Sequence, residues 1–160
     1  MRGEESMKVL YVASEAVPFA KSGGLGDVAG ALPAALRKKL VGVRVVLPLY
    51  QEIRQDLKDQ LTFLKEMWVP LSWRSQYCGI FEAKVNGVTY YLLDNQYYFG
   101  RRGFYGHFDD AERFAFFSKA ALELLQHIDF EPDVINCNDW QTGLLPFYLN
   151  KLYRNINDCG

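Results

Sequence analysis

Apolar residues form two short continuous runs near the start of the chain, separated by a stretch with helical periodicity. Lys8–Ser14 and Val43–Pro48 are the continuous runs, a pattern typical of parallel strands that are buried on both faces. Gly26–Lys39 has its apolar residues at helical spacing, and Pro33 predicts either a bend or the true first turn of that helix. Strand, helix and strand in this order predict a right-handed βαβ unit on a parallel sheet.

The middle of the chain follows a different pattern. Phe63–Trp73, Gln76–Val85 and Val88–Leu93 are rich in aromatic and β-branched residues, which favour strands. Asn86-Gly87 lies between the last two segments and is a strong signal for a two-residue hairpin turn. These segments therefore predict an antiparallel β-hairpin extension of the sheet.

The C-terminal part returns to alternating helix and strand. An aromatic, glycine-containing loop at Tyr97–Gly106 precedes a predicted helix that runs from Asp109 to about His127. Asp133–Asn136 is a short buried strand, and Asp139–Thr142 opens a last helix. The predicted class is α/β: one doubly wound, Rossmann-like domain with a mainly parallel sheet and a β-hairpin extension.

Composition narrows the function classes. The 160 residues are 49% hydrophobic with a formal net charge of −1, which fits one domain and gives no basic footprint for nucleic acid. Three cysteines without C-x-x-C spacing argue against a disulfide framework and a zinc site, so we expect a reducing, cytoplasmic location. No apolar run approaches the ~20 residues needed to span a membrane. Residues 1–6 are expected to be a disordered extension, residues 7–160 form the domain, and the helix-stopping Gly160 suggests a fragment.

Glycines dominate the segment that leads into the first predicted helix. Gly23, Gly24 and Gly26 lie at its start, where backbone N–H groups are unpaired and carry partial positive charge, and Lys21 adds a mobile cation. This arrangement predicts a cradle for a phosphate or diphosphate. The alternative is a flexible loop whose glycines only turn the chain. Asp27 is expected either to cap the helix or to contact the ligand.

Two familiar phosphate-binding motifs fit this segment poorly. Gly24-x-Gly26-x-x-Ala29 satisfies the dinucleotide pattern, but Glu15–Gly23 separates it from the strand and no acid ends the second strand. A P-loop requires a lysine after its glycines, whereas Lys21 precedes them. Because the dinucleotide pattern itself is present, an NAD(P)-dependent Rossmann domain nevertheless stays an alternative.

Three motifs resemble one known family in order and spacing. The segments are "KSGGLGDV" at Lys21–Val28, "VRVVLPLY" at Val43–Tyr50 and "NDWQTGLLPFYL" at Asn138–Leu149. They resemble bacterial glycogen synthases and plant starch synthases, and the resemblance covers the chain from about Met7 to its end. It implies the N-terminal half of a retaining GT-B glucosyltransferase, with ADP-glucose and an α-1,4-glucan as substrates. No residue cluster in the sequence implies a metal, and no other cofactor is expected. The C-terminal nucleotide-binding domain is expected to be missing from this chain, so the fragment alone is expected to be inactive.

The resemblance also assigns roles to residues. Lys21 is implied to contact the donor, which fits the negative charge that develops on a departing diphosphate. Some family members have a histidine where this chain has Asn138, so a histidine role does not transfer, and Asn138 and Asp139 are expected to act as hydrogen-bond partners in catalysis. Trp140 either stacks on a sugar or anchors the core.

The acceptor side is expected to involve further polar residues. Glu15 follows the first strand and is expected either to meet acceptor hydroxyls or to be solvated. Asp94, Asn95 and Tyr98 resemble a family segment that lines the acceptor, although most of the ten tyrosines must simply pack. A non-catalytic module that binds glucans through its tyrosines is a second alternative to the enzyme.

Overall fold

The computed structural model describes residues 7–153. The expectations for residues 1–6, Cys159 and Gly160 lie outside this range. The elements in chain order are β1 (Met7–Val12), α1 (Gly24–Lys38), β2 (Val41–Pro48), α2 (Gln55–Lys58), β3 (Thr62–Leu71), β4 (Arg74–Val85), β5 (Val88–Asp94), α3 (Gln96–Phe99), α4 (Asp110–Leu124), β6 (Val134–Cys137), η1 (Trp140–Thr142), α5 (Leu145–Tyr148) and η2 (Leu149–Tyr153).

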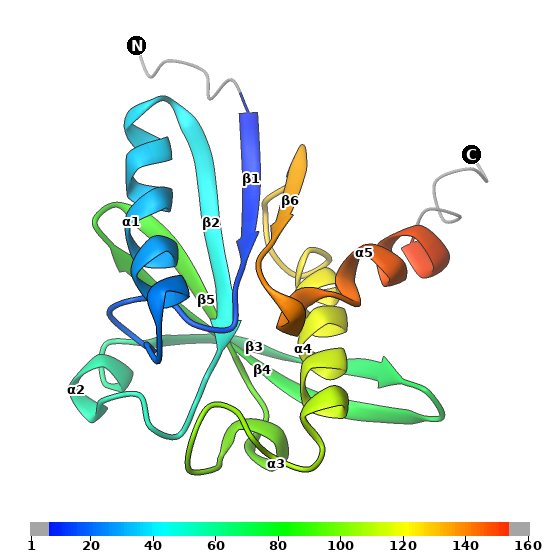
Figure 1. Cartoon of the computed structure of the whole chain (residues 1–160). Coiled ribbons are helices and arrows are strands. Elements are labelled where there is room, and N and C mark those ends of the chain that lie inside the picture. The colour runs from blue at the N-terminus through cyan, green and yellow to red at the C-terminus, as the bar shows by residue number, and fades with distance from the viewer. Residues whose placement is uncertain (1–6, 154–160) are drawn as a thin grey trace.

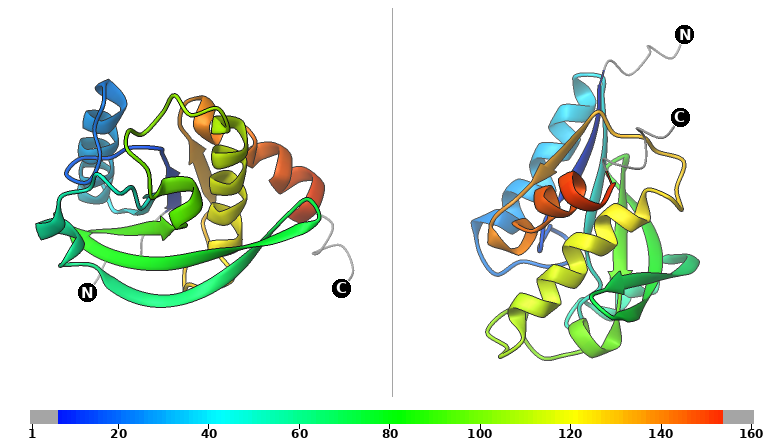
Figure 2. Two further views of the ribbon diagram at one scale, coloured as in Figure 1. Left: turned by 90° about the horizontal axis from the view of Figure 1, so that it is seen from below. Right: turned by 90° about the vertical axis from the view of Figure 1, so that its right-hand side faces the viewer.

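One six-stranded sheet organises these elements in the order β3-β4-β5-β2-β1-β6 (Figure 1). β5, β2, β1 and β6 run parallel, whereas β4 pairs antiparallel with both β3 and β5. β3 and β4 form a long curved ribbon that extends the parallel part of the sheet (Figure 2). The predicted α/β class, the parallel sheet and the antiparallel extension are confirmed.

Local sequence explains where the elements turn. Asn86 and Gly87 both have positive φ, 50° and 75°, as the predicted two-residue hairpin turn between β4 and β5 requires. Pro33 lies inside α1, which begins at Gly24, so the expectation that Pro33 marks the first turn is wrong. The predicted last helix is broken into η1, α5 and η2. Pro146 explains the break after Thr142, because its ring excludes a helical carbonyl four residues earlier.

Packing places helices against the sheet and an aromatic cluster beneath α4. α1 packs on β2 and β5, and α4 packs on β3 and β5. Phe99, Phe116 and Phe117 are fully buried where α3 meets α4, with aromatic centroids 6.2–6.4 Å apart. In the described residues, no helix is both long enough and apolar enough to cross a membrane.

Candidate active site at the carboxyl edge of the sheet

The loop between β1 and α1 is folded around one carboxylate. Glu15 is only 2% exposed. Its Oε2 accepts hydrogen bonds from the Ser22 amide at 3.0 Å, the Ser22 hydroxyl at 2.6 Å and the Tyr105 hydroxyl at 3.1 Å. Its Oε1 accepts from the amides of Gly23 and Gly26, each at 3.2 Å. The expectation of a solvated or acceptor-binding Glu15 is therefore corrected: five donors hold it inside the loop.

The same contacts revise the predicted phosphate cradle. The amides of Gly23 and Gly26 donate to Glu15, so the prediction that these two amides are free for a diphosphate is wrong in this structure. Gly24 and Leu25 open α1, and the described hydrogen bonds provide no protein acceptor for their amides beyond the helix itself. The electropositive end of α1 is thus open at its first two amides.

The glycines of this segment serve two different purposes. A Cβ at Gly23 or Gly24 would meet nothing within 4 Å, which leaves the backbone there open to a ligand. A Cβ at Gly30 would lie 2.9 Å from the Val17 carbonyl oxygen, and one at Gly26 would lie 3.1 Å from the Ala20 oxygen. Gly26 and Gly30 therefore permit α1 to pack against the loop, while Gly23 and Gly24 expose its start.

Lys21 lies at the rim of this loop. Its ammonium group is 2.7 Å from the Asp27 carboxylate, and both side chains are more than half exposed. Asp27 makes no capping hydrogen bond to the helix, so its expected capping role is wrong. An exposed pair of this kind contributes little to stability, on the order of 0–1 kcal/mol, so it leaves Lys21 available to a stronger anion.

Hydroxyl groups connect Glu15 to the ends of other strands. Tyr105 is within 2.7 Å of the Ser14 hydroxyl, and Tyr50, after β2, donates to the Ser14 carbonyl at 2.7 Å. Burial, together with the nearby charge of Glu15, raises the pKa of the Tyr105 hydroxyl, and burial raises that of Tyr50 well above its usual value. Both tyrosines thus remain protonated donors, and they fix the loop to the carboxyl edge of the sheet.

β6 delivers the second group of candidate residues beside the end of β1. The Asn138 amide nitrogen donates to the Val12 carbonyl at 3.0 Å and to the Asn136 side chain at 2.8 Å. This side-chain nitrogen therefore connects β6 to the last residue of β1. The predicted role of Asn138 as a hydrogen-bond partner of substrate then depends on its side-chain oxygen, Oδ1.

Asp139 has an unusual backbone conformation. Its φ of 64° and ψ of −178° fall in a region used almost only by glycine, which costs about 1–3 kcal/mol. Its carboxylate accepts from the Trp140 amide at 2.7 Å and so caps η1, as the sequence allowed. Strain of this kind is concentrated at functional sites, and Asp139 is exposed at the same edge as the β1–α1 loop.

Trp140 follows with 55% of its surface exposed, so the expectation of a core anchor is wrong. Its ring meets Phe114 edge-on, with centroids 5.2 Å apart, and it borders an apolar cavity of about 250 Å³ between α4 and η1. A stacking role for Trp140 stays a prediction.

Residues at the end of β5 are mostly structural. Tyr98 is fully buried and donates to Glu112 at 2.9 Å, and Asn95 is 5% exposed and caps α3 by accepting from the Tyr98 amide. Their expected contact with a glucan is therefore wrong, because neither side chain reaches the surface. Asp94 is half-buried, and burial raises the pKa of its carboxyl although Gln96 donates to it at 2.8 Å. Of the three, Asp94 alone is placed to meet a ligand.

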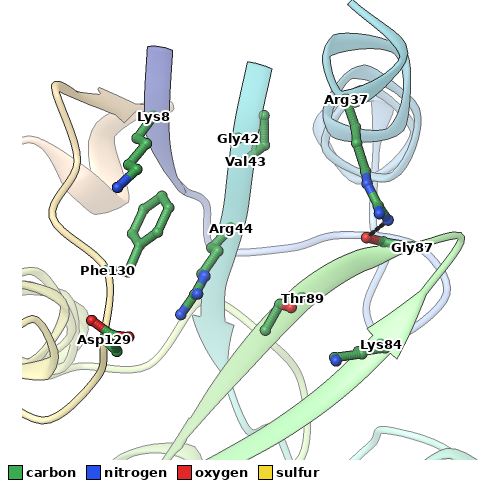
Figure 3. A pocket seen from close by; sticks show the side chains of 10 residues that line it. All are labelled: Lys8, Arg37, Gly42, Val43, Arg44, Lys84, Gly87, Thr89, Asp129 and Phe130. Atoms are coloured by element: carbon green, nitrogen blue, oxygen red, sulfur yellow. Dashed lines mark hydrogen bonds between the residues drawn. The ribbon is translucent and has the colours of Figure 1, made fainter. Parts of the chain in front are cut away.

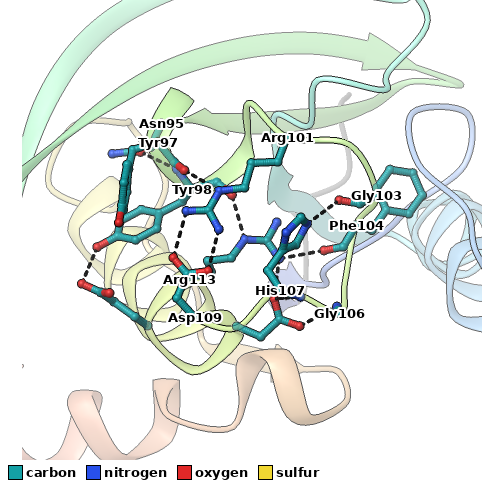
Figure 4. Close-up of polar contacts among 12 residues, drawn as sticks. Asn95, Tyr97, Tyr98, Arg101, Gly103, Phe104, Gly106, His107, Asp109 and Arg113 are labelled. Atoms are coloured by element: carbon teal, nitrogen blue, oxygen red, sulfur yellow. Dashed lines mark hydrogen bonds and ion pairs between the residues drawn. The ribbon is translucent and has the colours of Figure 1, made fainter.

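Two arginines that sequence reasoning missed order the loop over 100–109 (Figure 4). Arg101 grips Asp109 with two hydrogen bonds of 2.5 and 2.8 Å. Arg113 is 0% exposed and donates to the carbonyls of Tyr98 and Phe104 and to Asp110, at 2.7, 2.9 and 2.7 Å. The sequence signal was an arginine on the phenylalanine-rich face of a helix, where a cation must find internal partners.

Across residues 7–153, no group of three or more histidine, cysteine, aspartate or glutamate side chains is arranged to hold a metal ion. The polar groups at the carboxyl edge are instead one ammonium, open helix amides and exposed carboxylate and amide oxygens.

Together, a mainly parallel α/β sheet and polar loops at its carboxyl edge define a Rossmann-like ligand-binding domain. The family model for the starch synthase catalytic domain matches residues 8–159, and the chain belongs to this family. The resemblance stated from the three motifs is thereby confirmed.

Individual relatives agree with this assignment. Glycogen synthase from Clostridium botulinum (strain Eklund 17B / Type B) is 59% identical over 147 residues, which cover 92% of this chain and 31% of that protein. Glycogen synthase from Geobacillus stearothermophilus is 54% identical over 149 residues, 93% of this chain and 31% of that protein. The chain thus spans about a third of the length of these curated relatives.

A solved structure shows the same fold. The catalytic domain of starch synthase IV from Arabidopsis thaliana, bound to ADP and acarbose, superposes with a TM-score of 0.86 at 34% identity. The match covers 94% of this chain and 31% of that one.

Proposed function

We propose that this chain is the N-terminal part of a glucosyltransferase that moves glucose from ADP-glucose to the non-reducing end of an α-1,4-glucan with retention of configuration. Family membership and the glycogen synthase relatives support this activity. The ADP and acarbose bound to the Arabidopsis starch synthase support a nucleotide-sugar donor and a glucan acceptor.

The observation that carries the proposal is the open start of α1 with Lys21 beside it. When the bond from sugar to phosphate breaks, negative charge develops on the departing diphosphate. Within residues 7–153, the amides of Gly24 and Leu25 have no acceptor, and the one ion pair of Lys21 is with the exposed Asp27 carboxylate. One donor that is preset for a developing charge is commonly worth about 3 kcal/mol of barrier. If Lys21 exchanges Asp27 for the diphosphate, it stabilises the negative charge that develops as the bond from sugar to phosphate breaks.

Glu15 takes a supporting role in this proposal. Its carboxylate accepts hydrogen bonds from the amides of Ser22, Gly23 and Gly26 and so fixes the loop that carries Lys21. A diphosphate would be repelled from the amides on Glu15 and directed to those of Gly24 and Leu25. Glu15 is thus a positioning residue rather than an acceptor contact.

The other candidate residues are assigned to the sugar. Asp139 and the carbonyl oxygen of Asn138 lie beside the end of β1, where they can accept hydrogen bonds from sugar hydroxyls. A carboxylate there also favours the positive charge that develops on the sugar ring. Asp94, at the end of β5, is assigned to the acceptor side.

A second domain is required to complete this site. The nucleotide must be positioned and water excluded from two sides, and one α/β half presents only one wall. We therefore expect residues 7–160 to act as the N-terminal domain of a two-domain enzyme, and the chain alone to show little or no turnover.

A chimera tests the proposal. This chain replaces the matching part of the 59%-identical C. botulinum glycogen synthase, and transfer of labelled glucose from ADP-glucose or UDP-glucose to glycogen is measured. We expect ADP-glucose-dependent elongation by the chimera and none by the 160-residue chain. A folded chimera that binds glucan but never uses a nucleotide sugar would instead favour a glucan-binding module, and specific binding of NAD(P) would favour a dinucleotide domain.

A further inference from the structure

A second cavity lies at the opposite, amino edge of the sheet. Its volume is about 630 Å³, within the usual range of roughly 300–1,000 Å³ for small-molecule sites. The starts of β1, β2 and β5, the end of β4 and the loop before β6 form its walls (Figure 3). Because β1, β2 and β5 run parallel and the β1–α1 loop follows the opposite end of β1, the cavity is a full strand length from that loop and cannot share its ligand.

Cations dominate the lining of this cavity. Lys8, Arg37, Arg44 and Lys84 come from four different elements, and Asp129 is the one acid among the lining residues. Within residues 7–153 none of these four cations forms an ion pair with a carboxylate. Such a surplus of unpaired positive charge around one concave space raises the local concentration of anions.

Arg44 is the most rigid of the four. It is half-buried, its Nη1 donates to the Tyr91 hydroxyl at 2.5 Å, and its guanidinium lies 4.6 Å from the centre of the Phe130 ring. These contacts hold the guanidinium in place, and its other N–H groups have no carboxylate partner in the part of the chain that the structure describes. A planar guanidinium fixed in this way suits bidentate contact with a phosphate.

The remaining cations approach from the rim. Figure 3 shows Lys84 extending toward Arg44, Lys8 on the other side of the Phe130 ring, and Arg37 donating to the Gly87 carbonyl. Lys8 and Lys84 are exposed, so they can move onto a bound anion at little cost. Arg37 and its neighbours already complement the end of α1, but Lys8, Arg44 and Lys84 belong to strands and have no such explanation.

We propose that this cavity is a binding site for a small phosphate-bearing anion, separate from the site at the carboxyl edge. Phosphate is favoured over a carboxylate because Lys8, Arg44 and Lys84 line the cavity from three different strands, and a phosphate group has more oxygens than a carboxylate to contact them. The 630 Å³ volume admits a sugar phosphate or a nucleotide. Binding there would clamp β1, β2 and β4 together and stabilise the fold.

Calorimetric titration of the 160-residue chain with inorganic pyrophosphate tests this site. The titration uses a Lys21→Ala background, which removes the cation of the carboxyl-edge loop and leaves only the Gly24 and Leu25 amides there. Backbone amide NMR shifts locate the bound anion. We expect one saturable site that weakens with added salt, with shifts at Gly42 and Thr89 and none at Gly24. Glucose, which has no phosphate, is expected not to bind.

Matched charge variants decide whether the cavity is responsible. Lys8→Gln with Lys84→Gln should weaken pyrophosphate about tenfold, the factor that loss of ~1.4 kcal/mol of charged contact gives. Arg44→Gln alone should weaken it similarly. Lys65→Gln with Lys151→Gln removes the same charge from exposed positions outside the cavity and should change affinity less than about twofold.

Several outcomes overturn the proposal. They are the absence of saturable binding, an equal loss in the control pair, and shifts confined to Gly24 and its neighbours. Because Lys8 and Lys84 are exposed, their double variant should keep the unfolding temperature of the parent chain, so weakened binding cannot be attributed to misfolding.

Discussion

Substitution of Glu15 by glutamine tests how the β1–α1 loop is held. The glutamate accepts five hydrogen bonds, two on Oε1 from Gly23 and Gly26 and three on Oε2 from Ser22 and Tyr105. Glutamine has nearly the same shape but only one acceptor oxygen and two N–H donors. The change therefore removes acceptor capacity without leaving a cavity.

The magnitude follows from the best orientation open to glutamine. Its oxygen can serve Gly23 and Gly26 while its NH2 group donates to the hydroxyls of Ser22 and Tyr105, which can reverse their roles. The Ser22 amide then has no acceptor, and an orphaned donor of this kind costs about 1–3 kcal/mol. The remaining bonds change from charge-assisted to neutral and lose roughly half their strength. We expect a total of about 3 kcal/mol, which lowers the unfolding temperature by roughly 6–12 °C in a chain of this size.

Differential scanning calorimetry of Glu15→Gln against Glu66→Gln is the assay. Glu66 lies exposed on β3 and accepts no hydrogen bond from the described residues, so its variant should change stability by less than about 0.5 kcal/mol. If both variants unfold within about 2 °C of the parent, less than ~1 kcal/mol is lost and the buried carboxylate does not hold the loop.

Other substitutions probe the site and the fold separately. Gly30→Ala should lose about 1–3 kcal/mol in denaturant titration, because its Cβ would lie 2.9 Å from a carbonyl oxygen. Gly24→Ala meets nothing within 4 Å and should keep or slightly raise stability, yet reduce turnover of the chimera; unchanged turnover contradicts the open helix start. A hydrogen bond from Arg101 holds the pKa of Asp109 below 3.8, so its stabilisation is complete above that pH and is lost as the pH falls through the folded value; Asp109→Asn should flatten this acid-induced loss, measured by circular dichroism. Asp139→Asn keeps the shape of the side chain, so the backbone strain is unchanged and the side-chain oxygen can still cap η1; it should alter stability by less than ~1 kcal/mol, while chimera turnover falls about tenfold or more, and retained turnover argues against a role for the charge.

The fold was largely predictable because its signals are local. Continuous apolar runs indicated β1 and β2, and the positive φ that Asn86-Gly87 supplies indicated the hairpin. The short helices α2 and α3 were missed, since four residues are too few for a periodicity to register.

The site was predictable only in part. The position of the glycine-rich loop follows from its place after β1, but the partners of its amides do not. A carboxylate on a loop is usually solvated, and the closeness of Glu15 to the Ser22 and Gly26 amides depends on how the loop folds back. Tyr98 was misassigned for a similar reason: its burial follows from packing against α4, which is distant in the sequence.

The most direct test of the central claim measures the chemical step in the chimera with Lys21→Ala. The account has Lys21 acting on charge that develops as the diphosphate leaves, so kcat should fall about 100–1,000-fold while ADP binding weakens much less. A matched Lys65→Ala chimera should keep the parental kcat. An unchanged kcat for Lys21→Ala, or a loss seen only in ADP affinity, would contradict a role of Lys21 in stabilising the departing diphosphate.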